Sequence, residues 1–208
     1  MKAVPKNGAI ITAITVGSES LYRGNFTGSE LLTKIQEVQK LFPKVKVGTA
    51  DSWNKYADGT ADPLIKGGVK YFLINAFAFW QGKSIEDATK TFLDDMYQAS
   101  KHIEKIAGPE KYKEIHIATG ETGWPTDGGS DYGVAKAGTK NAQKFHDNAI
   151  CAMLGLGGDV FYFEAFDEPW KPKSVGDNGK AADETHWGMY KADRTPKFDV
   201  SCKKQKKN

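Results

Sequence analysis

Residues 115–125 have the sequence IHIATGETGWP, in which an apolar run ends at a glutamate with a glycine nearby on each side. A short, nearly continuous apolar run is typical of a strand covered on both faces, as in a parallel sheet. Packing such a strand needs no charged residue at its end, so Glu121 is a candidate functional carboxylate. We expect Gly120 and Gly123 to permit an unusual backbone or the close approach of a ligand.

Four further strand-like runs have the same character. They begin at Ala9 (AIITAITV), Val45 (VKVGTA), Tyr71 (YFLINAF) and Val160 (VFYFEAF). Strands that alternate with helices form βαβ units with right-handed crossovers, so the order of these runs predicts an α/β fold with a parallel sheet.

Helical patterns lie between the predicted strands. The capping box Thr27-Gly28-Ser29-Glu30 opens the first, which Pro43 helps to end. Apolar residues at helical spacing predict a second helix from Ser84 to Ile106. A third helix is expected from Lys140 to Leu154. Only a short helix fits the link 58–68, and the segment 155–158 is expected to be a turn.

Composition is that of one globular domain. The 208 residues are 39% apolar and 26% charged, with a net charge of +3. We expect a barrel domain over residues 1–202 and a solvated basic tail over 203–208. No basic stripe with interleaved aromatic residues indicates nucleic acid, and no apolar run is long enough to span a bilayer.

The chain start and the cysteines leave alternatives open. Residues 1–16 loosely resemble a signal peptide, but their apolar run is short and interrupted, which favours a buried strand. Cys151 and Cys202 could form one disulfide or remain two buried thiols. The Asn25 sequon would be used only in a secreted protein.

Polar residues collect where the predicted strands end. Glu19 follows the first strand, Asp51 the second, Asn75 lies in the third, and Glu121 follows the fourth. Parallel strands place their carboxyl ends on one side of a sheet, where the sites of α/β barrels are built. Glu19 and Glu121 are therefore expected to be neighbours, although Glu19 alone could equally be a carboxylate in the first turn of a helix or a surface ion-pair residue.

Four tryptophans also fall just past strands: Trp53, Trp80, Trp124 and Trp170. Each alone is typical of a core residue, but four at equivalent positions suggest a shared surface. Flat aromatic faces suit the apolar faces of sugar rings, and two carboxylates beside them indicate glycoside chemistry. The four histidines have no metal-ligand spacing and the cysteines are far apart, so we expect no metal and no cofactor.

Three motifs resemble glycoside hydrolase family 17, and within it the fungal cell-wall β-1,3-glucanases and glucanosyltransferases. They are VGSESLYRG (16–24), GETGWP (120–125) and FEAFDEPWK (163–171), within a similarity that runs from about Ala9 to Cys202. The resemblance implies a (β/α)₈ TIM barrel. It also implies a secreted cell-wall protein whose partner is β-1,3-glucan, and we expect a monomer without membrane or nucleic-acid contact.

The resemblance assigns roles by motif. Glu19 would be the general acid/base and Glu121 the nucleophile of a retaining enzyme. Sugar-contacting or supporting positions would be Ser18, Tyr22, Asn75, Trp80, Trp124, Glu168 and Lys171. Ser18 stands where many family members have asparagine, although serine looks usual in the fungal branch.

Length and activity remain open. Such barrels need about 250 residues, so we expect this chain to hold about strands 4–8 of the barrel. It would act as a hydrolase if water accepts the sugar and as a transglycosylase if another glucan does. The rival hypotheses are a non-catalytic glucan-binding wall protein and an inactive fragment.

Overall fold

The computed structural model describes residues 11–127, 131–172, 174–175 and 181–202. The predicted basic tail, 203–208, and the first ten residues lie outside this description. The chain forms two compact units. The first contains residues up to Asn75 together with Met96–Gly120, and the second contains Ala76–Asp95 together with the residues from Glu121 onward.

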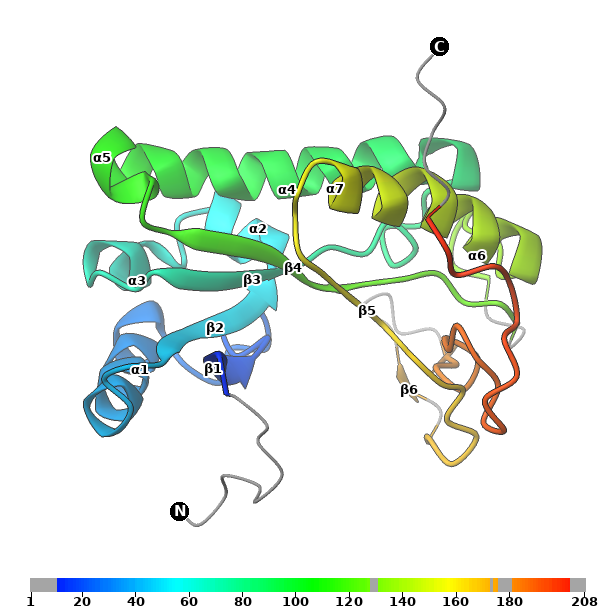
Figure 1. The fold of residues 1–208 in the computed structure, drawn as a ribbon, viewed down its shortest axis with the longest axis horizontal. Helices are drawn as coiled ribbons and strands as arrows, with labels where there is room; N and C mark the ends of the chain where they lie inside the picture. Colours follow the sequence, from blue (N-terminus) through cyan, green and yellow to red (C-terminus); the bar gives the residue numbers. More distant parts are fainter. Residues whose placement is uncertain (1–10, 128–130, 173, 176–180, 203–208) are drawn as a thin grey trace. The chain divides into compact units, whose positions relative to one another are not determined.

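A five-stranded sheet has the order β1-β2-β3-β4-β5. Its strands are β1 (Ala13–Ser18), β2 (Lys46–Ser52), β3 (Tyr71–Asn75), β4 (His116–Thr122) and β5 (Val160–Tyr162). β1, β2 and β3 pair in parallel, and the arrows of β2, β3 and β4 point the same way in Figure 1. Each of the five predicted runs therefore overlaps an observed strand. A small antiparallel pair, β6 (Ser174–Val175) and β7 (Ala181–Ala182), was not predicted.

The helices also follow the predicted pattern. They are α1 (Gly28–Leu41), α2 (Trp53–Ala57), α3 (Asp62–Lys66), α4 (Ile85–Ala107), α5 (Pro109–Tyr112), α6 (Thr139–Phe145) and α7 (Cys151–Gly155). A π-helical segment, η1 (His146–Ile150), joins α6 to α7, so the predicted third helix is one run with a π-helical centre. The expected short helix is α3, whereas α2 and α5 were not foreseen. No helix within the described ranges has the length and apolar character needed to cross a bilayer.

Strand β3 is buried along its whole length, as its continuous apolar run predicts. In the first unit Phe72 packs edge-on against Tyr56, whose hydroxyl donates to the Leu73 carbonyl. Helix α1 buries Leu31 and Ile35.

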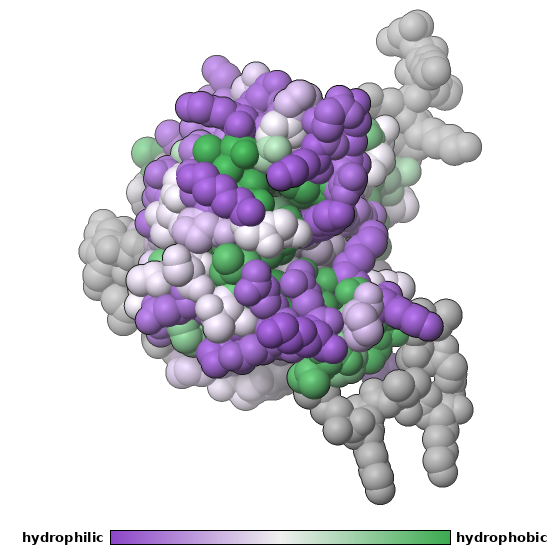
Figure 2. Space-filling model, turned by 90° about the vertical axis from the view of Figure 1, so that its left-hand side faces the viewer, coloured by the Kyte–Doolittle hydropathy of each residue, from purple (hydrophilic) through white to green (hydrophobic). Residues whose placement is uncertain are grey.

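The face in Figure 2 is covered mainly by hydrophilic side chains, with apolar areas scattered between them, which is ordinary for a protein surface.

The predicted capping box at the start of α1 is complete. Thr27 Oγ1 accepts from the Glu30 N–H at 3.3 Å, and the Glu30 carboxylate accepts from the Thr27 N–H at 2.8 Å.

Because the substitution Thr27→Ala leaves a helix N–H without its cap, it should lower the free energy of unfolding by about 1 kcal/mol in urea titrations. Thr33→Ala, on an exposed position of the same helix, should change it by less than about 0.5 kcal/mol. Equal losses in both variants would contradict this role of the cap.

Asp95 is a buried carboxyl on α4. It is 2% exposed and accepts a hydrogen bond from Gln81 Nε2 at 2.5 Å. Burial raises the pKa of Asp95 from 3.8 to about 7, against the opposing effect of the Gln81 hydrogen bond. A carboxyl whose folded pKa is raised stabilises the protein below its unfolded pKa, and that stability is lost as the pH rises through about 7.

The variant Asp95→Asn should therefore be more stable than the wild type at pH 8, by up to about 4 kcal/mol, because the neutral amide avoids ionisation in the core. The difference should vanish near pH 4, where Asp95 is itself neutral. Urea unfolding at both pH values measures it, with Glu37→Gln, at an exposed position of α1, as a control. A gain that is the same at pH 4 and pH 8 would show that Asp95 does not resist ionisation.

Candidate active site

Glu19 follows β1 at an irregular point of the sheet. The pairing of β1 with β2 shifts register between Thr15 and Ser18, and Gly17 has a φ of +80°. Glu19 itself has a φ of +53°, in the left-handed region that costs a non-glycine residue roughly 1–2 kcal/mol. Such strain persists where the surrounding structure imposes it, often at functional sites.

The Glu19 carboxylate has partners from two elements. Arg23 Nη2 lies 2.6 Å from Oε2, and Asn75 Nδ2, from the end of β3, lies 3.4 Å from Oε1. The side chain of Glu19 is only 18% exposed. The ion pair considered as an alternative from the sequence is therefore present, but a buried amide from a second strand shares the carboxylate.

Asn75 carries an unsatisfied polar atom beside Glu19. The residue is 2% exposed, and its Oδ1 has no hydrogen-bond partner among the described residues. Buried polar atoms are nearly always paired, so an unpaired acceptor indicates a place for a ligand hydroxyl or a water. Ser18 is exposed and Tyr22 half-buried, and both belong to the segment that carries Glu19.

Asp51, at the end of β2, was not among the predicted site residues. It is fully buried, and its carboxylate accepts three main-chain hydrogen bonds, from Leu21, Tyr22 and Ser52. Burial raises the pKa of Asp51, and these three bonds oppose the rise. Its position after a predicted strand was the only signal in the sequence.

In the second unit, Glu121 is half-buried near the end of β4, and its carbonyl accepts from the Ala76 N–H at 2.9 Å. The expected ligand approach at the neighbouring glycines is corrected by the structure. A Cβ at Gly123 would lie 2.0 Å from the Phe163 carbonyl oxygen, and one at Gly120 would lie 2.5 Å from Asn75 Oδ1. The absent side chains therefore make room for protein atoms.

The expected row of exposed tryptophans is also corrected. Trp124 is fully buried, packs edge-on against Phe79, and donates its ring N–H to the Lys136 carbonyl at 2.9 Å. Trp80 is partly buried and stacks on the buried Trp187, with ring centroids 5.1 Å apart. Only Trp170 is strongly exposed, at 71%. The aromatic residues thus build a packed cluster in which Trp80 keeps some exposure.

Lys171 bridges two carboxylates after β5. Its Nζ lies 2.8 Å from Glu168 and 2.8 Å from Glu164, a residue that the sequence did not single out. Burial raises the pKa of Glu164 to about 7, whereas the Lys171 hydrogen bond lowers that of Glu168. Because one ammonium serves both carboxyl groups, the expected pair Glu168–Lys171 is in fact a triad.

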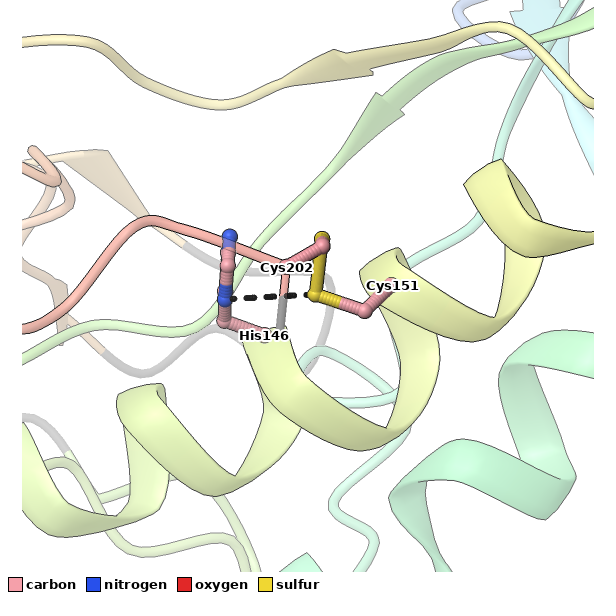
Figure 3. Close-up of side chains that lie close together, drawn as sticks. All are labelled: His146, Cys151 and Cys202. Atoms are coloured by element: carbon pink, nitrogen blue, oxygen red, sulfur yellow. Dashed lines mark hydrogen bonds between the residues drawn. A yellow bond between two sulfur atoms is a disulfide. The ribbon is translucent and has the colours of Figure 1, made fainter. Parts of the chain in front are cut away.

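Two further groupings lie in the second unit. His146 Nδ1 is 3.8 Å from Cys151 Sγ, and Cys151 forms a disulfide with Cys202 (Figure 3). His146, Cys151 and Cys202 are residue types that bind metal ions, and their spacing in the sequence did not reveal that they lie together. Cysteines joined in a disulfide, however, supply no thiolate to a metal.

A cavity of about 600 Å³ is lined by residues that follow β4 and β5, among them Thr126, Asp127, Asp167 and Pro169.

Comparison with known proteins identifies relatives over nearly the whole chain. A glucan 1,3-beta-glucosidase of Arthroderma benhamiae is 70% identical over 206 residues, which cover 99% of this chain and 66% of that protein. The family 17 β-1,3-glucanosyltransferase of Rhizomucor miehei matches in structure with a TM-score of 0.75 and 26% identity, covering 91% of this chain and 64% of the other. An active-site mutant of that enzyme, solved with laminaritriose, matches with a TM-score of 0.74 and 26% identity over the same shares of both chains.

The chain thus spans just under two thirds of the length of these proteins. Its parallel α/β fold matches part of the family 17 barrel, which confirms the predicted fold class. The model of the BtgE/BtgC glycoside hydrolase domain matches residues 2–188. The chain therefore belongs to the family of the BtgE/BtgC glycoside hydrolase domain, in agreement with the resemblance of its motifs to glycoside hydrolase family 17.

Proposed function

We propose that this protein cleaves β-1,3-glucan with retention of configuration, with Glu121 as nucleophile and Glu19 as general acid/base. The observation that carries the proposal is the Glu19 carboxylate, held in a left-handed backbone beside the unsatisfied Asn75 Oδ1. Relatives named as a glucan 1,3-beta-glucosidase and a β-1,3-glucanosyltransferase supply the substrate class.

In the first step Glu121 would attack the anomeric carbon while Glu19 gives its proton to the leaving glycosidic oxygen. The products are a glycosyl–enzyme ester and a shortened glucan. In the second step Glu19, now a carboxylate, takes a proton from the acceptor hydroxyl, which displaces Glu121 and restores both groups. Retention requires the two carboxyl groups to lie about 5–5.5 Å apart, and a separation of about 9 Å would contradict it.

The remaining predicted residues would bind or support. Asn75 Oδ1 could accept from a sugar hydroxyl, and Ser18, Tyr22 and Trp80 would contact the sugar. The buried Trp124 would act through packing. The Lys171 ammonium, shared by Glu164 and Glu168, would set the electrostatic field around Glu121.

A secreted, cell-wall location belongs to the same proposal. The disulfide between Cys151 and Cys202 favours an oxidising compartment, where such bonds persist. Asn25, the glycan acceptor of the sequon, is exposed. We further propose that the protein acts as a monomer.

Product analysis tests this function. The purified chain would be incubated with β-1,3-glucan oligosaccharides of one length, and the products would be sized by chromatography. Shorter products alone indicate a hydrolase, and longer ones as well indicate a transglycosylase. Binding without turnover by a folded wild type would instead support the non-catalytic glucan-binding protein, and absence of a cooperative thermal transition would support the inactive fragment.

A further inference from the structure

Asp51 fastens the segment that carries Glu19. The Asp51 carboxylate accepts the Leu21 N–H on Oδ2 at 2.8 Å and the Tyr22 N–H on Oδ1 at 3.1 Å, across about thirty residues of sequence. Oδ1 also accepts the Ser52 N–H at 2.9 Å. These donors therefore bond to a buried side chain of β2.

Ala50 and Thr49, which precede Asp51 on β2, bond to Glu19 and Val16. The Ala50 carbonyl accepts from the Glu19 N–H at 3.0 Å, and Thr49 Oγ1 donates to the Val16 carbonyl at 2.9 Å. Thr49 and Asp51 are fully buried, and Ala50 is 6% exposed. The end of β2 thus contacts the chain on both sides of Glu19, where the backbone takes its unfavourable left-handed conformation.

Only a carboxylate satisfies this geometry. Both of its oxygens accept, and each one faces a main-chain donor. An asparagine would have to turn its NH₂ group toward one of these N–H groups, which would lose that bond and leave a buried donor unpaired. A neutral residue of the same shape therefore cannot hold the segment in the same way.

We infer that Asp51 is a positioning residue, which acts through the main chain of Leu21 and Tyr22 to aim the Glu19 carboxylate at the leaving oxygen. The inference rests on the proposed function. A misplacement of about 1 Å can cost roughly 100-fold in rate, so the effect of losing Asp51 should be large and specific to the step that needs the acid.

Leaving-group dependence separates this role from a general loss of structure. In a dinitrophenyl β-glucan oligosaccharide the leaving dinitrophenolate departs without protonation, whereas the sugar hydroxyl that leaves from an unmodified oligosaccharide needs the Glu19 proton. In Asp51→Asn we expect kcat/KM to fall by about 100-fold on the unmodified substrate and by less than about 3-fold on the dinitrophenyl one. The control Asp62→Asn removes a carboxylate of α3 that pairs with His102 of α4, and it should change neither.

Amide hydrogen exchange on the wild type tests, without any assay of catalysis, whether the Asp51 carboxylate holds the Leu21 and Tyr22 N–H groups. The N–H groups of Leu21 and Tyr22 should exchange at least about 100-fold more slowly than the unprotected rate, although they lie outside helix and strand. If Asp51→Asn does not fold, Thr49→Val, which removes the hydroxyl that bonds to the Val16 carbonyl and more weakly to that of Ala50, should show the same selective loss on a smaller scale.

The outcomes are distinct. Equal losses on both substrates, no loss on either, or rapid exchange at Leu21 and Tyr22 overturns the positioning role. A wild type that cleaves neither substrate overturns the proposed function and with it the catalytic meaning of Asp51, while the exchange data still decide whether Asp51 fastens the segment.

Discussion

Replacing Glu121 with glutamine is expected to lower the turnover of β-1,3-glucan oligosaccharides by about 10⁴-fold or more, since single nucleophile deletions in hydrolases have effects of that size. The amide has the shape of the carboxylate but cannot form the glycosyl–enzyme ester. Oligosaccharide affinity should stay within about threefold of the wild type, because the substitution removes the nucleophile but keeps the groups that contact the sugar. Initial rates and calorimetric titration measure the two quantities.

The matched control is Glu110→Gln. Glu110 is an exposed residue on α5 that pairs with Lys113, so the same change there should leave both rate and affinity unchanged. If Glu121→Gln retains more than about a tenth of the wild-type rate, Glu121 is not the nucleophile. If it instead loses binding in proportion to rate, its role is to hold the sugar.

Removal of the disulfide between Cys151 and Cys202 should strongly destabilise the protein. Cys151 and Cys202 are 51 residues apart in the sequence. Closing a loop of that length lowers the conformational entropy of the unfolded chain, which raises its free energy by about 4 kcal/mol. We therefore expect Cys202→Ser to lower the free energy of unfolding by up to about 4 kcal/mol. Urea titration under non-reducing conditions measures it.

Hydrogen bonds near the disulfide should survive the substitution. Gln143 on α6 donates to the Asp199 carbonyl at 2.8 Å and accepts from the Asp199 N–H at 2.9 Å, so the segment before Cys202 keeps a contact with the helix. The double variant Cys151→Ser/Cys202→Ser should lose as much free energy of unfolding as the single variant, because both lack the same disulfide bond. A loss below about 0.5 kcal/mol in both would show that the disulfide does not restrict the unfolded chain.

Much of the fold was predictable because its signals are local. The Thr27–Glu30 capping box and the apolar spacing along α4 are set by residues within a few positions of each other, and both predictions are confirmed. The same holds for β3, where a continuous apolar run marks a strand buried on both faces. The π-helical segment η1 has no such signal, and the sequence predicted a uniform helix there.

The sequence by itself determined the five strands of the sheet and the long helices between them, the family, and the positions of Glu19 and Glu121 at strand ends, because periodicity and short motifs carry that information. Only the tertiary structure decided that Asp51 holds the Glu19 segment, that Asn75 reaches Glu19, that Lys171 also binds Glu164, that Trp124 is buried, and that Cys151 pairs with Cys202. Four of these are contacts between particular residues, and most of them join residues about 30 to 56 positions apart. Burial of Trp124 likewise depends on packing against distant segments, and neither pattern nor propensity encodes which distant partner a side chain meets.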